Sequence, residues 1–291
     1  MVLLTLILIT AIWGWTFVVV KEALDQVGPW LFLFWRFTLA TLLAAPLFLR
    51  ARGRFQGDTL RRGLQLGLAL FGGYLFQTWG LVYTTAQKSG LITGLFVVLV
   101  PPIAWVWGSR PSGKSWLAVG LATAGIVLLA GGNLEGGTWF GDLLTVICAF
   151  SFALHVVLLD RYAKGQDPQV LLFLQVGVVA VLSALGTGLV EGFSLPRSGV
   201  VWQGVLITAG LATTLAFLIM TWAGKHLGAI TMALILSFEP AFAAFFGWIL
   251  RGEVLNLKQI FGAILVLLGI LAQSVLFPLI DRRKLGLDNR A

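Results

Sequence analysis

Three ionisable side chains lie inside long apolar stretches, and they are the residues of this chain best suited to chemistry. They are Arg36, His155 and Glu239. A charge placed in hydrocarbon costs at least about 2.5–3.5 kcal/mol, so such residues face protein or a water-filled cavity and mark substrate or ion pathways. The planar fork of an arginine suits a carboxylate, and a histidine or glutamate can carry a proton. Together the three residues predict solute binding and proton transfer within a membrane.

Each of these residues also has a structural interpretation. Arg36 can anchor its helix by bonding backbone carbonyls, and His155 can be a hydrogen-bonded member of a helix bundle. Glu239 can satisfy backbone groups that the adjacent Pro240 leaves free. Because Glu239 is the only carboxylate at mid-span, it is the candidate for proton coupling. We expect no other cofactor and no metal, since no His and Cys residues are grouped at metal-ligand spacing.

Uncharged polar and aromatic residues complete the predicted substrate pathway. Trp13 is too deep in its stretch to belong to an interfacial aromatic belt. Tyr74 and Gln77 share a helix face at i,i+3, and Trp79 follows in the same stretch. Rings with a few amides suit small amphipathic solutes. We expect no catalytic residue and no enzyme, because intramembrane proteases and transferases need clustered Ser/His, paired Asp or His-rich metal sites.

The elements that must position these residues are membrane-spanning helices. The chain is 58% hydrophobic and 11% charged, with a mean hydropathy of +0.95, whereas soluble domains are about 25% charged. About 20 apolar residues cross a bilayer, and the charges divide the chain into stretches of that size. This pattern predicts an all-α polytopic membrane protein with ten spans, at 2–20, 30–49, 64–83, 89–109, 115–133, 143–159, 170–190, 200–222, 227–250 and 259–279.

Two prolines, 139 residues apart, interrupt the fourth and ninth spans. Pro101 and Pro240 each remove a backbone hydrogen bond, which costs about 3 kcal/mol within a helix. Interrupted spans at corresponding places in two halves of a chain mark the binding site of many transporters. We therefore predict helix breaks at Pro101 and Pro240, next to the substrate site.

The distribution of Lys and Arg predicts the orientation in the membrane. Fourteen of these residues lie on the side of Met1 and five on the opposite side, so the positive-inside rule places both termini in the cytoplasm. The net charge of +8 is explained by this topology, and no nucleic-acid partner is expected because no soluble domain carries a basic face. The first span lacks a basic leader region, which favours a retained helix over a signal peptide.

An internal repeat relates the two halves of the chain. Residues 3–21 align with 143–161, and a nearly identical offset aligns Pro101 with Pro240. The predicted repeats are residues 1–134 and 139–279, joined by the glycine-rich stretch 131–137 and followed by a basic cytoplasmic tail, 280–291. Because each repeat holds five spans, the second enters the membrane inverted. Inverted repeats are typical of transporters that work by alternating access.

Short motifs along the whole chain carry a family resemblance. They are Trp13-Gly14-Trp15-Thr16-Phe17 with Lys21, Pro29 with Arg36, Tyr83-Thr84-Thr85-Ala86, Pro101, Glu239-Pro240 and Gly252-Glu253. In this order and spacing the chain resembles the drug/metabolite transporter superfamily, specifically its ten-helix EamA branch. One departure is that the acidic Glu253 has no counterpart after the fourth span, where Ser109-Arg110 stands. The two halves are therefore not expected to be functionally equivalent.

The resemblance implies a secondary transporter in the bacterial plasma (inner) membrane that exports amino acids or related small metabolites. Its partners would be the small-molecule substrate and membrane lipid. No Walker loop is present, so no ATPase subunit is expected. A nucleotide-sugar or phosphorylated-solute carrier of the same superfamily is an alternative that needs several buried cations, of which Arg36 alone is evident. A lipid flippase, the other alternative, would have a groove open sideways to lipid.

Overall fold

A computed structural model of the chain describes residues 2–129, 136–251 and 257–276. Most of the predicted linker 131–137, the Gly252-Glu253 motif and the basic tail 280–291 lie outside the described residues. Every regular element within the described ranges is helical. Seven helical stretches there are long and apolar enough to cross a membrane, and two shorter apolar helices accompany them. The prediction of an all-α polytopic membrane protein with about ten spans is confirmed.

The helices coincide with the predicted spans, and each predicted span corresponds to one helix or to consecutive helical segments. They are α1 (Val2–Leu24), α2 (Pro29–Ala51), α3 (Thr59–Tyr83), α4 (Ala86–Gly94), α5 (Phe96–Val106), α6 (Gly113–Leu129), α7 (Trp139–Ala163), α8 (Pro168–Gly186), α9 (Gly199–Ile207), α10 (Ala216–Ala223), α11 (Ala229–Leu236), α12 (Glu239–Arg251) and α13 (Leu257–Leu271). Four short segments extend them, namely the 3-10 turn η1 (Arg52–Arg54) and the π-helical η2 (Thr187–Glu191), η3 (Thr208–Leu215) and η4 (Ala272–Leu276).

Helix starts follow from local sequence. Proline stands at the first position of α2 and of α8, where its missing N–H costs nothing. Asp167 caps α8 by accepting a hydrogen bond of 2.8 Å from the Gln169 backbone N–H. The start of α2 is capped by a residue that is far away in the sequence. The Glu191 carboxylate accepts hydrogen bonds from the backbone N–H groups of Trp30 and Leu31, at 3.1 and 2.8 Å. These acceptors fix where the spans begin.

Two spans are broken near the middle of the bundle. One break lies at Leu95 between α4 and α5, and the other at Ser237 and Phe238 between α11 and α12. The predicted break at Pro240 is close to the observed one, since Pro240 is the second residue of α12 and fits a first helical turn. The predicted break at Pro101 is wrong in position, because Pro101 lies inside α5, six residues beyond the interruption.

The two breaks lie beside one another. A Cβ at Gly94 would lie 3.0 Å from Cγ of Pro240, so the end of α4 contacts the start of α12. The helix α1 crosses the same place, since a Cβ at Gly14 would lie 2.8 Å from the Glu239 carbonyl oxygen. A side chain larger than hydrogen at Gly14 would push these backbones apart, which explains the glycine between Trp13 and Trp15.

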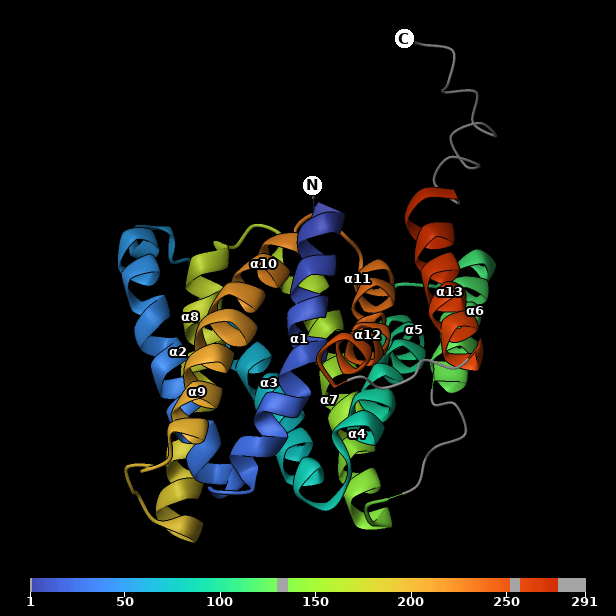
Figure 1. The fold of residues 1–291 in the computed structure, drawn as a ribbon. Coiled ribbons are helices and arrows are strands. Elements are labelled where there is room, and N and C mark those ends of the chain that lie inside the picture. The colour runs from blue at the N-terminus through green and yellow to red at the C-terminus, as the bar shows by residue number, and fades with distance from the viewer. Residues whose placement is uncertain (1, 130–135, 252–256, 277–291) are drawn as a thin grey trace.

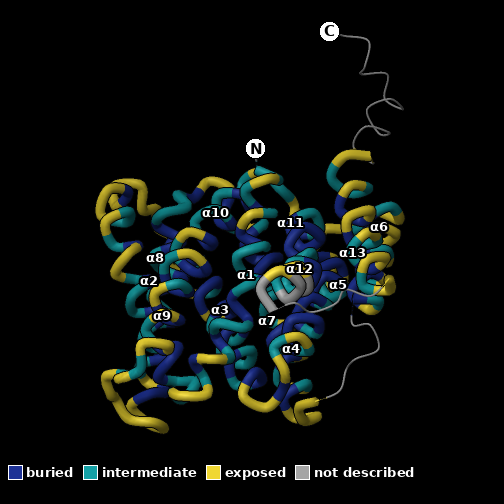
Figure 2. The backbone as a smooth tube through the Cα atoms, in the orientation of Figure 1, coloured by how far each residue is buried: buried dark blue, intermediate teal, exposed yellow. Residues whose placement is uncertain are grey.

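The helices form one bundle with α1, α3 and α7 at its centre (Figure 1). The closest pairings are α3 with α7, α6 with α13, and α2 with α8. The pair α6–α13 lies at one edge of the bundle and α2–α8 toward the other (Figure 1). Residues at the centre are buried and the outward surfaces are exposed (Figure 2). The two ends of the described chain lie at the same end of the bundle, as an even number of crossings requires.

Candidate functional site

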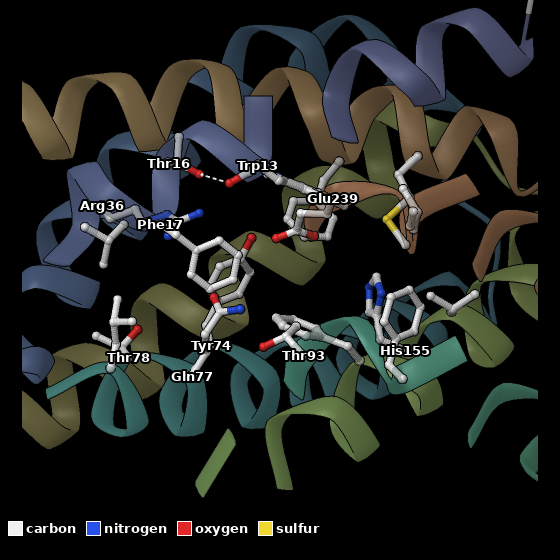
Figure 3. A pocket seen from close by; sticks show the side chains of 18 residues that line it. Trp13, Thr16, Phe17, Arg36, Tyr74, Gln77, Thr78, Thr93, His155 and Glu239 are labelled. Carbon is white, nitrogen blue, oxygen red and sulfur yellow. Dashed lines mark hydrogen bonds between the residues drawn. The ribbon is translucent and has the colours of Figure 1, made fainter. Parts of the chain in front are cut away.

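A cavity lies between the central helices. Nine of the described helices contribute residues to its wall, and Figure 3 shows the lining side chains. The lining residues are Trp13, Thr16, Phe17, Val20, Arg36, Tyr74, Gln77, Thr78, Leu81, Thr93, Phe96, Phe152, His155, Val156, Phe217, Met220, Leu236 and Glu239. Most are apolar or aromatic, with few charged or amide groups among them. Such a lining is typical of small-molecule sites.

Two helices contribute whole stripes to the wall. On α1 the stripe is Trp13, Thr16, Phe17 and Val20, and on α3 it is Tyr74, Gln77, Thr78 and Leu81. Both follow the i, i+3, i+4, i+7 spacing of a single helix face. Both stripes occupy the second half of their helix. The cavity therefore extends from mid-depth toward the end of the bundle opposite the N-terminus (Figure 1).

Arg36 enters the cavity from α2 and is 3% exposed. Its Nε donates a hydrogen bond of 3.0 Å to Oγ1 of Thr213. The guanidinium carbon lies 4.4 Å from the centre of the Tyr74 ring, a cation–π distance. Within the described part of the chain no carboxylate forms an ion pair with Arg36. The positive charge is thus buried without a negative partner.

Glu239 faces the same cavity from the first turn of α12 and is 8% exposed. Figure 3 shows its carboxyl group pointing into the space near Trp13. Among the described residues none forms a hydrogen bond or ion pair with this carboxyl group. A buried carboxylate without a partner is costly, so this group is the candidate in the cavity for binding a proton or a cation. Its position at a helix start also favours an acidic side chain.

His155 is satisfied by a buried chain of hydrogen bonds. Its Nε2 donates to Oε1 of Gln175 at 2.8 Å, and Nε2 of Gln175 donates to Oγ1 of Thr221 at 3.0 Å. The imidazole also packs edge-on against Phe217, with ring centres 5.7 Å apart. His155 therefore lines the cavity but is held on its Nε2 side by α8 and α10. The structural interpretation of this residue is the better supported.

Aromatic rings surround the polar groups of the cavity. The Trp13 indole N–H donates a hydrogen bond of 2.8 Å to the Ala212 carbonyl, which leaves the ring faces for packing. The Tyr74 ring contacts Phe37, Phe152 and Phe217, with centre distances of 4.9, 5.3 and 6.0 Å. These contacts fix the ring that lies against the Arg36 guanidinium. The result is a rigid aromatic wall around one cation and one carboxyl group.

The structure brings six of the seven predicted pathway residues to one cavity, namely Trp13, Arg36, Tyr74, Gln77, His155 and Glu239. Trp79, the seventh, does not line this cavity. The wall on α3 uses Thr78 and Leu81, and Trp79 is rotated about 100° from Thr78. The neighbours that the sequence interpretation missed, such as Thr16 and Phe17, lie on the stripes that start at Trp13 and Tyr74. Helical spacing counted from those two residues would have found them.

Comparisons with known proteins identify the family of this chain. The EamA-like transporter family matches residues 1–131 and 139–275. The chain belongs to the EamA-like transporter family. It is 35% identical to an uncharacterized transporter of Archaeoglobus fulgidus, over 94% of this chain and 85% of that protein. It is 25% identical to the uncharacterized transporter YoaV of Bacillus subtilis, over 97% of this chain and 99% of that protein.

Two further comparisons concern the fold and the membrane. A solved crystal structure superposes on this EamA-like transporter with a TM-score of 0.74 at 21% identity, covering 94% of this chain and 98% of the other. That likeness shows the fold alone. The uncharacterized inner membrane transporter YedA of Escherichia coli is 27% identical over 61% of this chain and 60% of its own. The EamA-like transporter is therefore a multi-pass membrane protein that acts in transport.

Proposed function

We propose that this EamA-like transporter exports amino acids or related small zwitterionic metabolites by alternating access, with a proton as the coupling ion. The observation that carries the proposal is the charge arrangement of the cavity. Arg36 is buried in its wall without an anionic partner among the described residues. A substrate carboxylate can supply that partner, because the arginine fork binds both carboxylate oxygens.

The rest of the cavity suits the remainder of such a substrate. The ring faces of Trp13, Tyr74 and Phe217 can pack an apolar side chain, and an ammonium group is attracted to aromatic faces. Gln77 adds an amide that can donate or accept. Glu239, which needs a proton or a cation when it is buried, provides the group that a proton gradient can act on.

The shape and position of the cavity support alternating access. Two broken helices meet at it, since Gly94 of α4 contacts Pro240 of α12. Substrate sites of secondary transporters lie beside such breaks near the bilayer midplane. The cavity reaches toward the end of the bundle opposite the N-terminus. With cytoplasmic termini, as the Lys and Arg distribution predicts, that end of the bundle is the outer one.

The alternatives within the superfamily fit the cavity less well. A carrier of nucleotide sugars or other phosphorylated solutes needs several cations, and among the described residues Arg36 is the only Lys or Arg in the cavity lining. A lipid flippase needs a groove that opens sideways to lipid. The lining here comes from nine helices of both halves of the described chain, which favours a central site for a soluble substrate.

Reconstituted transport tests the proposal. Purified protein in proteoliposomes is given radiolabelled L-phenylalanine, L-leucine, L-glutamate, L-lysine and a nucleotide sugar, with and without an imposed pH gradient. We expect a neutral amino acid to be taken up, and its accumulation to depend on the gradient. Uptake of the nucleotide sugar alone would contradict the proposal. Accumulation that ignores the gradient would remove the proton from the mechanism.

A further inference from the structure

The span that faces Arg36 contains a long π-helical segment. It runs from α9 through η3 to α10, with η3 covering Thr208–Leu215. Besides Val201 and Ala223 near its ends, its buried residues come in adjacent pairs that repeat every four positions, at 204/205, 208/209, 212/213, 216/217 and 220/221. In an α-helix a four-residue repeat drifts about 40° around the axis at each step. The wider π turn offsets this drift and keeps the pairs on one face.

This register brings two consecutive residues of η3 to two residues of the cavity. The Ala212 carbonyl accepts from the Trp13 indole N–H at 2.8 Å. The Thr213 hydroxyl accepts from Nε of Arg36 at 3.0 Å. Phe217 follows one turn later and lines the cavity itself. Since π-helical turns are frequently found at functional sites, the contact between Thr213 and Arg36 is the part of η3 most directly tied to the cavity.

We propose that Thr213 is a positioning residue for the substrate carboxylate, acting through Arg36. Its hydroxyl holds Nε on one side, and the Tyr74 ring lies 4.4 Å from the guanidinium carbon. Two contacts fix the plane of a group that otherwise rotates about several bonds. Arg36 also shares a side-chain hydrogen bond with Tyr74, and the N–H donors that these contacts leave, of the five that the side chain carries, can meet a carboxylate in a prepared geometry. Such preorganisation strengthens binding because less side-chain freedom is lost. The inference rests on the proposed function.

The neighbouring threonine provides a matched control. Thr214 lies in the same π segment, and its Oγ1 donates to the Ala209 carbonyl at 2.8 Å and to the Ala40 carbonyl at 3.3 Å. It does not line the cavity. Thr214→Val therefore removes one hydrogen bond within η3 and one to the α2 backbone, and it removes no contact of the Arg36 side chain. Thr213→Val is the isosteric change at the proposed positioning residue, and Thr213→Ser restores the hydroxyl.

The test measures equilibrium binding of radiolabelled L-phenylalanine to purified, folded protein. We expect Thr213→Val to raise the Kd about fivefold to tenfold, as one charge-assisted hydrogen bond is lost. Thr213→Ser and Thr214→Val should stay within about twofold of the wild type. The same Thr213→Val change made in an Arg36→Lys background should have no further effect, because the group it positions is gone.

Each outcome separates this inference from the proposed function. Equal effects of Thr213→Val and Thr214→Val, or the same effect in both Arg36 backgrounds, would overturn the positioning role while leaving Arg36 as the carboxylate site. No effect of Thr213→Val beside a strong effect of Arg36→Lys would do the same. If wild-type protein binds none of the four amino acids of the transport panel, or if Arg36→Lys binds its substrate normally, the proposed function fails and the role of Thr213 falls with it.

Discussion

At the residue scale, the proposed binding of a substrate carboxylate depends on the planar guanidinium group of Arg36. Arg36→Lys keeps the positive charge but loses the two parallel N–H groups that match a carboxylate. We expect the Kd and the KM for a carboxylate substrate to rise about tenfold or more, the equivalent of at least about 1.4 kcal/mol. The measurement is binding and transport per folded molecule, with folding checked by size-exclusion chromatography. A loss confined to protein yield, with normal activity of the folded fraction, would assign Arg36 to structure alone.

The residues of the site were predicted from sequence to different degrees, for a physical reason. Arg36 and Glu239 were predictable because a charge in hydrocarbon must face a protected or wet place. No such criterion shows which of Trp79 and Thr78 lines the cavity. Lipid and protein interior are both apolar, so a hydrophobic helix does not reveal which face turns inward. Once one cavity residue such as Tyr74 is known, the other residues on the same helix face follow from helical spacing.

At the element scale, close helix contacts make a stability prediction. In α6, a Cβ at Gly125 would lie 2.5 Å from the Gly262 carbonyl oxygen of α13 and 2.8 Å from the Val266 backbone nitrogen. Backbone atoms cannot move aside as a side chain can. We expect Gly125→Ala to destabilise the protein by about 1–3 kcal/mol, lowering the midpoint of thermal unfolding in detergent.

The same helix offers the control. Gly120 has open space around its Cβ position, so Gly120→Ala should leave the unfolding midpoint unchanged or raise it slightly, since alanine favours a helix. Equal effects of the two substitutions would show that α6 and α13 do not meet as closely as described. Activity of the folded fraction should be similar in both variants, because neither glycine lines the cavity.

The positions of the spans were predictable, but their internal geometry was not. Length and charge spacing predicted each span, because the bilayer fixes how many apolar residues are needed. Pro101 did not mark the break in its span, which lies at Leu95. A helix can absorb a proline when neighbouring helices satisfy the freed backbone groups. The π segment η3 was not predicted either, because the four-residue repeat of its span becomes visible only in the burial that the structure shows.

At the scale of the whole molecule, topology gives the next prediction. Both ends of the described chain lie at one end of the bundle (Figure 1), and fourteen Lys and Arg residues against five assign that end to the cytoplasm. A fluorescent protein fused to the C-terminus should therefore fluoresce, and alkaline phosphatase fused there should be inactive. The opposite pattern would invert the membrane orientation and turn the cavity toward the cytoplasm.

The predicted duplication is supported by the pattern of helix pairings. If the repeats are 1–134 and 139–279, α2 corresponds to α8 and α6 to α13. These corresponding helices pack against each other, as a pseudo-two-fold relation between halves requires. The broken spans α4–α5 and α11–α12 also correspond, and they meet at Gly94 and Pro240. The repeat stays a prediction, and it explains why one cavity lies between the halves.

In the proposed mechanism, one cavity that holds Arg36 and Glu239 couples the movement of substrate to the movement of a proton. Its most direct test compares two modes of L-phenylalanine transport by the Glu239→Gln variant in the same proteoliposomes. Glutamine has nearly the shape of glutamate but cannot exchange a proton at physiological pH. We predict that accumulation driven by a pH gradient is abolished, whereas exchange of labelled for unlabelled substrate continues. Undiminished gradient-driven accumulation by Glu239→Gln would contradict the account.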